Sequence, residues 1–158
     1  MTCQADIDAF LCDKRLALAG ASRSGKKFGN TIIKELSTKG FDVIPVHPEA
    51  ETIDGHPCAR SLAELSDDVD RLVAVVPPEQ TLRLVEQAPA AGITKIWMQQ
   101  GAESPEAVEL CERNDITVVH GECILMFAEP VTSIHRFHRW IWRLLGKLPT
   151  VESGEAGR

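Results

Sequence analysis

The sequence lacks the features that mark several common classes of protein. Its 158 residues contain no apolar run approaching the ~18 residues that span a bilayer, and the first residues are neither basic nor strongly apolar. The 17 Lys and Arg residues against 23 Asp and Glu residues give a net charge of −6, which offers no general support for binding a nucleic-acid backbone. We therefore expect a cytoplasmic protein that binds neither nucleic acid nor a membrane.

Disulfide, zinc and catalytic frameworks are absent as well. The five cysteines are odd in number and widely separated, without a C-x-x-C pair or a matching histidine spacing; they are Cys3, Cys12, Cys58, Cys111 and Cys123. Such a set is typical of reduced thiols in a cytosol-like compartment. No Ser/His/Asp or paired-carboxylate arrangement is evident either. These absences favour a protein without a metal site or a catalytic site.

What the sequence does contain is an alternation of short apolar, β-branched runs with amphipathic stretches, which is typical of βαβ units. The expected strands are 16–19, 42–46, 72–76, 95–98 and 117–119, and the expected helices are 5–12, 28–38, 79–91 and 105–114. Gly40 and Gly92 stand where helices should end, and Ser104-Pro105 should begin one. The predicted fold class is α/β: a Rossmann-like, three-layer, doubly wound sheet of about five mainly parallel strands, plus a C-terminal basic amphipathic helix.

That last helix is expected over residues 131–150. VTSIHRFHRWIWRLLGKL places apolar residues at helical spacing and contains four Arg or Lys residues and no acid. The helix could pack on its own domain, form a homodimer or partner interface through Trp140 and Trp142, or lie on an anionic membrane; we favour the first two. The chain is therefore divided into a domain over residues 1–130, this helix over 131–150 and a flexible tail over 151–158.

A glycine-rich turn, LALAGASRSGKKFG, follows the first expected strand. Gly20, Gly25 and Lys26 fall almost on the phosphate-binding pattern G-x-x-x-x-G-K-[ST]. Backbone N–H groups in such a turn, beside a helix N-terminus, bind anions. However, Lys27 stands where magnesium requires a hydroxyl, and the third and fourth strands run into proline and glutamine rather than an acid. NTP hydrolysis is therefore not expected.

A dinucleotide site is the second candidate for this turn. Its G-x-G-x-x-G pattern is missing because Gly20 is followed by Ala21 and Ser22, and the second strand ends in Val46-His47-Pro48 rather than an acid. A neutral or basic strand end suits the phosphorylated ribose of NADP or CoA better than a free diol. An NAD(P)-binding, oxidoreductase-like protein stays open as an alternative, as does an interaction protein that acts through its C-terminal helix.

Five motifs in order at successive strand ends carry a family resemblance. They are GAS, VIPVHP, VAVVPP, KIWMQQG and VVHGEC. Together they resemble the small CoA-binding domain proteins, whose fold is similar to the N-terminal, CoA-binding domain of the succinyl-CoA synthetase α subunit. The resemblance covers about residues 7–127 and implies a non-catalytic binding or regulatory module for CoA or a short acyl-CoA. The synthetase's phosphorylated histidine belongs to a second domain that this chain is too short to hold, so no ligase activity is implied.

The resemblance also implies which residues meet CoA. The pyrophosphate would be lined by Gly20, Ala21 and Ser22, and the phosphates would be neutralised by Arg23, Lys26 and Lys27. The adenosine end would be bordered by Val46, His47 and Pro48, an apolar wall would be formed by Val76, Pro77 and Pro78, and the pantetheine would be bordered by Gln99, Gln100 and Gly101. Cys123 could lie near the cofactor thiol, but we favour a buried, apolar role for it.

Overall fold

The computed structural model describes residues 2–128, and the helix and tail expected over 131–158 lie outside the described residues. The helices are α1 (Gln4–Leu11), α2 (Phe28–Thr38), α3 (Pro78–Gln87) and α4 (Pro105–Arg113). The strands are β1 (Arg15–Ala19), β2 (Asp42–Val46), β3 (Thr52–Ile53), β4 (His56–Pro57), β5 (Arg71–Ala74), β6 (Lys95–Met98) and β7 (Thr117–His120). Three short 3-10 turns are η1 (Leu62–Glu64), η2 (Pro89–Ala91) and η3 (Ile124–Met126).

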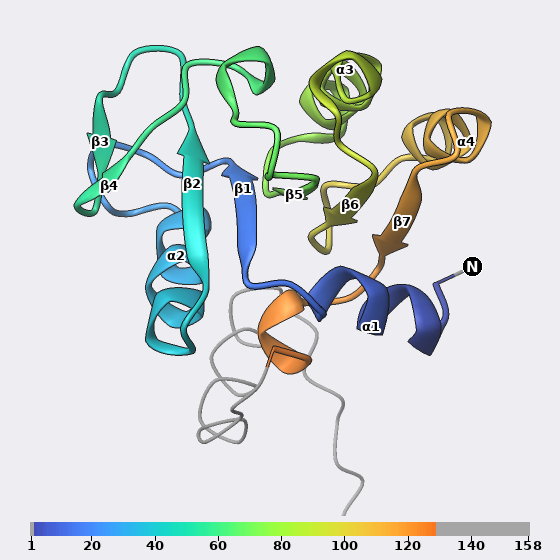
Figure 1. Ribbon diagram of the computed structural model, residues 1–158, viewed down its shortest axis with the longest axis horizontal. Helices are drawn as coiled ribbons and strands as arrows, with labels where there is room; N and C mark the ends of the chain where they lie inside the picture. The colour runs from blue at the N-terminus through green and yellow to red at the C-terminus, as the bar shows by residue number, and fades with distance from the viewer. Residues whose placement is uncertain (1, 129–158) are drawn as a thin grey trace, which may run out of the picture.

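Five strands form one parallel sheet in the order β2-β1-β5-β6-β7 (Figure 1). The chain runs outward from β1 to β2, returns to the other side of β1 as β5, and continues outward to β7. The carboxyl ends of β1 and β5 therefore flank the point where the winding reverses, which is where open α/β sheets bind ligands. The predicted Rossmann-like fold with a five-stranded parallel sheet is confirmed.

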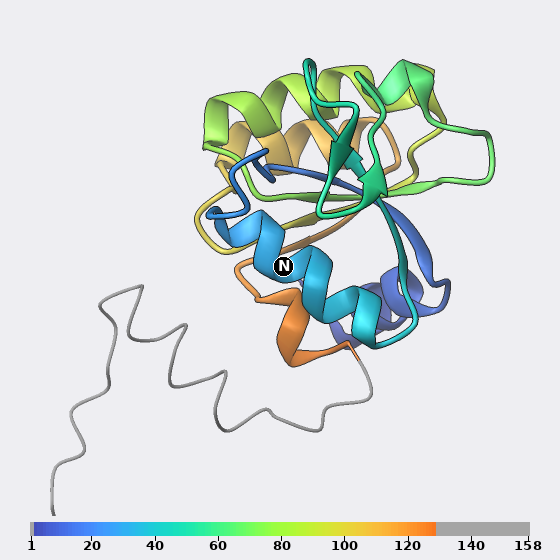
Figure 2. The same ribbon diagram turned by 90° about the vertical axis from the view of Figure 1, so that its left-hand side faces the viewer.

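The sheet is the middle of three layers. Figure 2 shows α3 and α4 over one face and α1, α2 and η3 over the other. Side chains of β1 alternate between these layers: Leu16 and Leu18 pack in the core with α1 and α2, whereas Ala17 and Ala19 pack in the core with α3 and α4. Because both faces are covered, the strands read as continuous apolar runs, which made them visible in the sequence.

The start of α4 follows the expected capping chemistry. The Ser104 hydroxyl accepts a hydrogen bond from the Ala107 N–H at 3.2 Å, and α4 begins at the next residue, Pro105. The expected helix over 79–91 instead stops at Gln87 and is followed by the 3-10 turn η2. Proline 89 explains the difference, since it has no N–H to continue the α-helical hydrogen bonds.

The β3–β4 hairpin was not predicted from the sequence. Its two-residue turn is Asp54-Gly55, and both residues have positive φ, 50° and 82°, as a tight hairpin turn requires. Each strand is two residues long, too short for any alternation of apolar and polar side chains to appear. An Asp-Gly pair was therefore the one usable signal.

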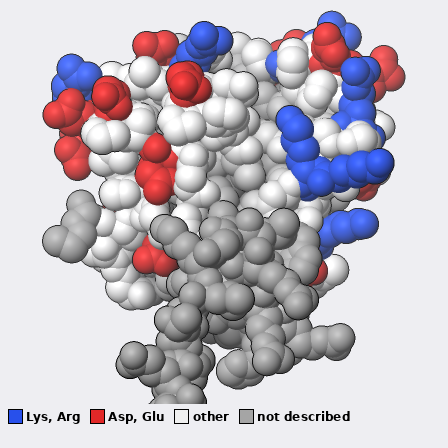
Figure 3. Space-filling view, turned by 180° about the vertical axis from the view of Figure 1, so that it is seen from behind, with Lys and Arg blue, Asp and Glu red and all other residues white. Residues whose placement is uncertain are grey.

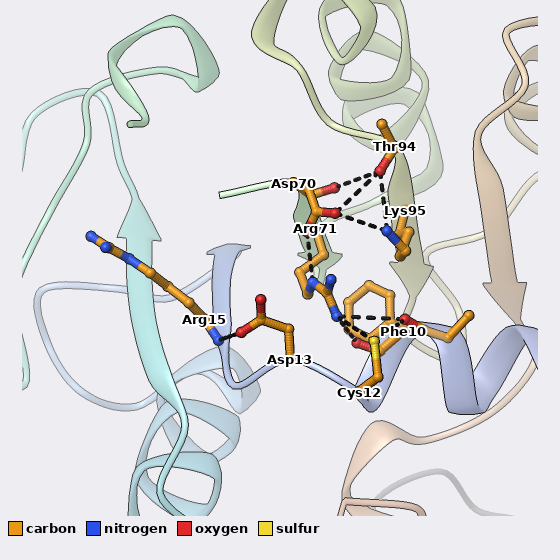
Figure 4. Close-up of polar contacts among 9 residues, drawn as sticks. Phe10, Cys12, Asp13, Arg15, Asp70, Arg71, Thr94 and Lys95 are labelled. Carbon is orange, nitrogen blue, oxygen red and sulfur yellow. Dashed lines mark hydrogen bonds and ion pairs between the residues drawn. The ribbon is translucent and has the colours of Figure 1, made fainter. Parts of the chain in front are cut away.

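Arg71 makes buried polar contacts at the amino end of the sheet, the end opposite the carboxyl ends of β1 and β5 (Figure 4). This side chain is 3% exposed; its Nη1 donates to the Phe10 carbonyl at 2.6 Å and its Nε to Asp70 Oδ1 at 2.7 Å. Asp70 also accepts from Lys95 Nζ at 2.8 Å. Arg71 thereby satisfies a carbonyl of the last turn of α1 that has no partner within the helix, and it fixes α1 to β5.

We expect the substitution Asp70→Asn to lower the free energy of unfolding at pH 7 by about 1–2 kcal/mol, allowing for solvent screening. Burial raises the pKa of Asp70, but the hydrogen bonds and charges of Arg71 and Lys95 outweigh it and lower the pKa to about 2. The stabilisation is present above the unfolded pKa, near 4, and is lost as the pH falls towards 2. Urea denaturation from pH 7 to pH 2.5 should show the two proteins converging.

Asp67→Asn is the control, because this exposed side chain makes no hydrogen bond or ion pair within residues 2–128. An equal loss in both variants, or a loss for Asp70→Asn that does not change with pH, would contradict the assignment.

Candidate functional site

The turn after β1 is pressed against its neighbours with no side chain in between. Gly20 has φ +120°, and a Cβ atom there would lie 2.3 Å from the carbonyl oxygen of Val75. A Cβ atom at Gly29, in the first turn of α2, would lie 2.5 Å from the carbonyl oxygen of Gly20. Only glycine fits at both positions, so the backbones of the turn, α2 and the segment after β5 meet directly. Dinucleotide sites use glycines in the same way, for close helix–strand packing.

A buried asparagine holds the rest of the loop in place. Asn30 is 2% exposed; its Oδ1 accepts from the Ser22 N–H and its Nδ2 donates to the Ser22 carbonyl, both at 2.9 Å. The same Nδ2 donates to Asp54 Oδ2 at 2.8 Å. The glycine turn is therefore tied to the β3–β4 hairpin through one amide. Since the Ser22 N–H is already used, Ser22 can offer a ligand its hydroxyl, which lies 2.9 Å from the Ser24 hydroxyl.

A pocket of about 470 Å³ opens beside this turn. Four segments of chain line it: the end of β1 with its turn, the end of β2, the segment from the β3–β4 hairpin to η1, and the residues from the end of β5 into α3. Its volume lies within the range of small-molecule sites. The pocket thus sits at carboxyl ends of β1 and β2, next to the point where the winding of the sheet reverses.

The charges in this pocket are all of one sign. Lys27, Arg60 and Arg83 line it, and none of its lining residues is Asp or Glu. None of these three cations takes part in the ion pairs found within residues 2–128. In Figure 3, Lys and Arg side chains gather on the flank that carries α2, β2 and the β3–β4 hairpin. For a chain of net charge −6, such a pocket favours an anionic ligand.

His47 borders the pocket in a defined tautomer. Its Nδ1 accepts hydrogen bonds from the N–H groups of Glu49 and Ala50 at 3.1 and 3.0 Å. An acceptor nitrogen carries no hydrogen, so the hydrogen of the neutral ring is on Nε2. His47 therefore shapes the chain after β2 with one nitrogen and presents a donor with the other.

The structure brings together about half of the predicted site residues. Those that line the pocket are Gly20, Ala21, Lys27, Val46, His47, Pro48 and Val76. Arg23 does not line it and pairs with Glu49 at 3.4 Å, and Lys26 is exposed outside it. Pro77 and Pro78 also lie outside the lining, because they cap and begin α3.

The predicted pantetheine residues lie elsewhere. Gln99 is 3% exposed and its Oε1 accepts from the Ile124 N–H at 3.2 Å, so it joins the end of β6 to η3. Gln100 and Gly101 follow in an exposed turn and do not line the pocket. Cys123 is 3% exposed, as favoured from the sequence, and burial raises the pKa of its thiol.

Sequence reasoning missed a second group of lining residues. They are Arg60, Ser61, Leu62, Gln80, Arg83, Leu84 and Gln87. The last four are spaced i, i+3, i+4 and i+7, so they form one stripe along α3. That spacing was a usable signal, whereas the positions of Arg60, Ser61 and Leu62 depend on the β3–β4 hairpin, which was not predicted.

The described part of the chain contains neither a membrane-spanning helix nor a cluster of metal ligands. None of the helices within residues 2–128 is long and apolar enough to cross a membrane. The same residues contain no group of three or more His, Cys, Asp or Glu side chains that could hold a metal ion.

With this geometry in place, the comparisons identify the class of protein. The family described as CoA binding domain matches residues 14–129. The chain belongs to this family, as the five sequence motifs predicted.

Particular relatives include ligases and small stand-alone proteins. The chain is 29% identical to acetate–CoA ligase (ADP-forming) I of Archaeoglobus fulgidus over 136 residues, or 80% of this chain and 20% of the ligase. It is 26% identical to the uncharacterized protein YneT of Bacillus subtilis over 70% of this chain and 82% of YneT. The chain thus spans about a fifth of the ligase's length.

Solved structures of small proteins have a fold similar to that of this chain. A conserved hypothetical protein from Pyrococcus furiosus is 44% identical with a TM-score of 0.68, covering 71% of this chain and 97% of that one. A hypothetical protein from Pyrococcus horikoshii is 28% identical with a TM-score of 0.73, covering 84% of this chain and 94% of that one.

We expect Gly20→Ala to destabilise the fold by about 3 kcal/mol or more, since the new methyl group meets the Val75 carbonyl and the backbone is left-handed. The control is Gly92→Ala, where φ is +74° but no atom lies within 4 Å of the new Cβ. It isolates the backbone cost of about 1–2 kcal/mol. If urea denaturation gave the two variants a similar loss in the free energy of unfolding, the close approach of Gly20 to Val75 would not contribute to stability.

The Asn30–Asp54 contact can be tested by exchanging the two side chains. Asn30→Asp should cost about 2 kcal/mol, because it removes the donor to the Ser22 carbonyl and places two carboxylates together. Asp54→Asn alone should cost little, since its amide oxygen can still accept. The double variant should recover about 1 kcal/mol of the loss. Additive losses in a double-mutant cycle would refute the contact.

Proposed function

We propose that this protein binds CoA or a short acyl-CoA, with the cofactor pyrophosphate at the Gly20-Ala21-Ser22 turn, and acts as a non-catalytic binding or regulatory module. The observation that carries the proposal is the pocket beside this turn, which is lined by no carboxylate and by three cations that form no ion pair with any residue from 2 to 128. Membership of the CoA binding domain family supports the identity of the ligand.

The residues of the pocket fit the parts of such a ligand. Gly20 and Gly29 let the backbone of the turn lie directly against α2 and the segment after β5, which sets the turn beside the N-terminus of α2, where a phosphate would bind. Lys27, at the N-terminus of α2, would balance phosphate charge where a lysine alone opposes the helix dipole. Val46 and Val76 provide apolar surface for the adenosine. Bound CoA would supply a thiol that carries acyl groups as thioesters.

Two other nucleotide classes fit less well. A magnesium–nucleotide complex needs a hydroxyl at position 27, which is lysine. NAD needs an acid to bind its ribose hydroxyls, and no acid lines the pocket. NADP matches the charge equally well, so the choice of CoA over NADP rests on the family.

A binding role is supported by the chemistry of the nearby side chains. No carboxylate lines the pocket to act as a general acid or base, and Nδ1 of His47 is occupied by two backbone N–H groups. Burial raises the pKa of the Cys123 thiol, which disfavours the nucleophilic thiolate. The Archaeoglobus fulgidus ligase is about five times longer than the region it shares with this chain, and its activity is not proposed for this protein.

We expect CoA and acetyl-CoA to stabilise the protein against heat, by about 2.7 kcal/mol at 100 times the dissociation constant, or several degrees. NAD, NADP and Mg-ATP should give much smaller shifts under the same reducing conditions. Lys27→Ala should weaken CoA binding about tenfold through loss of a charge-assisted contact. Lys34→Ala, an exposed lysine of α2 outside the pocket, is the matched control. Stabilisation by NADP or Mg-ATP but not by CoA would reject the proposal.

A further inference from the structure

The wall of the pocket formed by α3 is polar at regular intervals. Gln80, Arg83, Leu84 and Gln87 all line the pocket, and their spacing places them on one face of the helix. Arg60 lines the same pocket from the segment between β4 and η1. Arg60 and Arg83 therefore line one pocket from two separate segments of the chain, and both segments are distant in sequence from the glycine turn.

Neither guanidinium is neutralised by an acidic side chain within the described part of the chain. Arg60 contributes its backbone N–H, but not its side chain, to Glu64, whose Oε2 accepts at 2.9 Å. Within residues 2–128, neither Arg60 nor Arg83 has an ion-pair partner, although other arginines in this region do, such as Arg15 and Arg71. A guanidinium presents a planar set of N–H donors that matches a phosphate in bidentate geometry. Two of them in one pocket suit a dianionic phosphate.

The turn and the arginines would then serve different phosphates. The pyrophosphate is assigned to Lys27 and to the glycine turn that follows β1. Arg60 lies on the segment that leads to η1, and Arg83 lies on α3. These two segments and the end of β2 form the rest of the pocket lining. CoA carries a further phosphate on the 3′ position of its ribose, joined to the pyrophosphate through the same sugar.

We propose that Arg60 and Arg83 form a second phosphate subsite that binds the 3′-phosphate of CoA and selects CoA over 3′-dephospho-CoA. This inference rests on the proposed function, because it requires a CoA-type ligand with its pyrophosphate at the glycine turn. Both arginines are exposed, so their side chains contribute to recognition rather than to the core.

The test compares two ligands by isothermal titration calorimetry on the full chain. The wild type should bind CoA at least tenfold more tightly than 3′-dephospho-CoA. Arg60→Gln and Arg83→Gln should each weaken CoA binding about tenfold and change 3′-dephospho-CoA binding less than threefold, and in the double variant the two affinities should become nearly equal. Arg113→Gln, an exposed arginine of α4 outside the pocket, should leave the ratio unchanged.

The outcomes separate this inference from the function on which it rests. If the wild type binds CoA but the double variant keeps the same preference, or loses affinity equally for both ligands, the subsite is refuted and CoA binding stands. If the wild type binds neither form of CoA, the proposed function fails and the subsite fails with it. The thermal unfolding of each free variant reports its folding. Arg60→Lys and Arg83→Lys, which keep the charge but lose the fork, should reduce the preference only in part.

Discussion

The contact of backbone against backbone at Gly20 is the constraint on which the rest of the site depends. The turn can lie beneath α2 and beside the segment after β5 only because neither Gly20 nor Gly29 has a Cβ atom. This contact sets where α2 begins relative to the sheet, and hence where Lys27 stands. A bulkier residue at either position would move the helix N-terminus away from the strand ends, and with it the basic edge of the pocket.

Close packing fixes the turn from one side, and the Asn30 amide fixes it from the other. A buried amide that satisfies both the N–H and the carbonyl of Ser22 leaves that residue little freedom. Its third hydrogen bond, to Asp54, joins the loop to the β3–β4 hairpin. The chain that leaves this hairpin carries Arg60 into the pocket wall. One side chain thus connects the two segments that supply opposite parts of the proposed binding site.

Residues next to long, regular elements were predictable, whereas those placed by short elements were not. Helix 28–38 and strand 42–46 were predicted with the ends they have, because their apolar patterns extend over several helical turns or over a whole strand. Gly20 and His47 followed from these ends, since parallel strands deliver their carboxyl ends to one edge. Arg60 depends on a hairpin with two-residue strands. Arg83 is an exception, because it lies on the long helix α3 and its spacing from Gln80 and Gln87 could have indicated a shared face.

The carboxyl edge of the sheet is divided into an open half and a closed half. Over β6 and β7, Gln99 bonds to the Ile124 N–H and the Trp97 indole donates to the Glu122 carbonyl at 3.1 Å, so the chain after β7 closes over this half. Over β1 and β2, the pocket is lined by three cations, Lys27, Arg60 and Arg83, that have no ion-pair partner among residues 2–128. A buried polar group needs a hydrogen-bond partner within the protein, whereas a cation that lines an open pocket can form its ion pair with a bound ligand. Gln99 and His47 both follow the end of a parallel strand, but Gln99 is buried and accepts a hydrogen bond from the first residue of η3, whereas His47 borders the pocket.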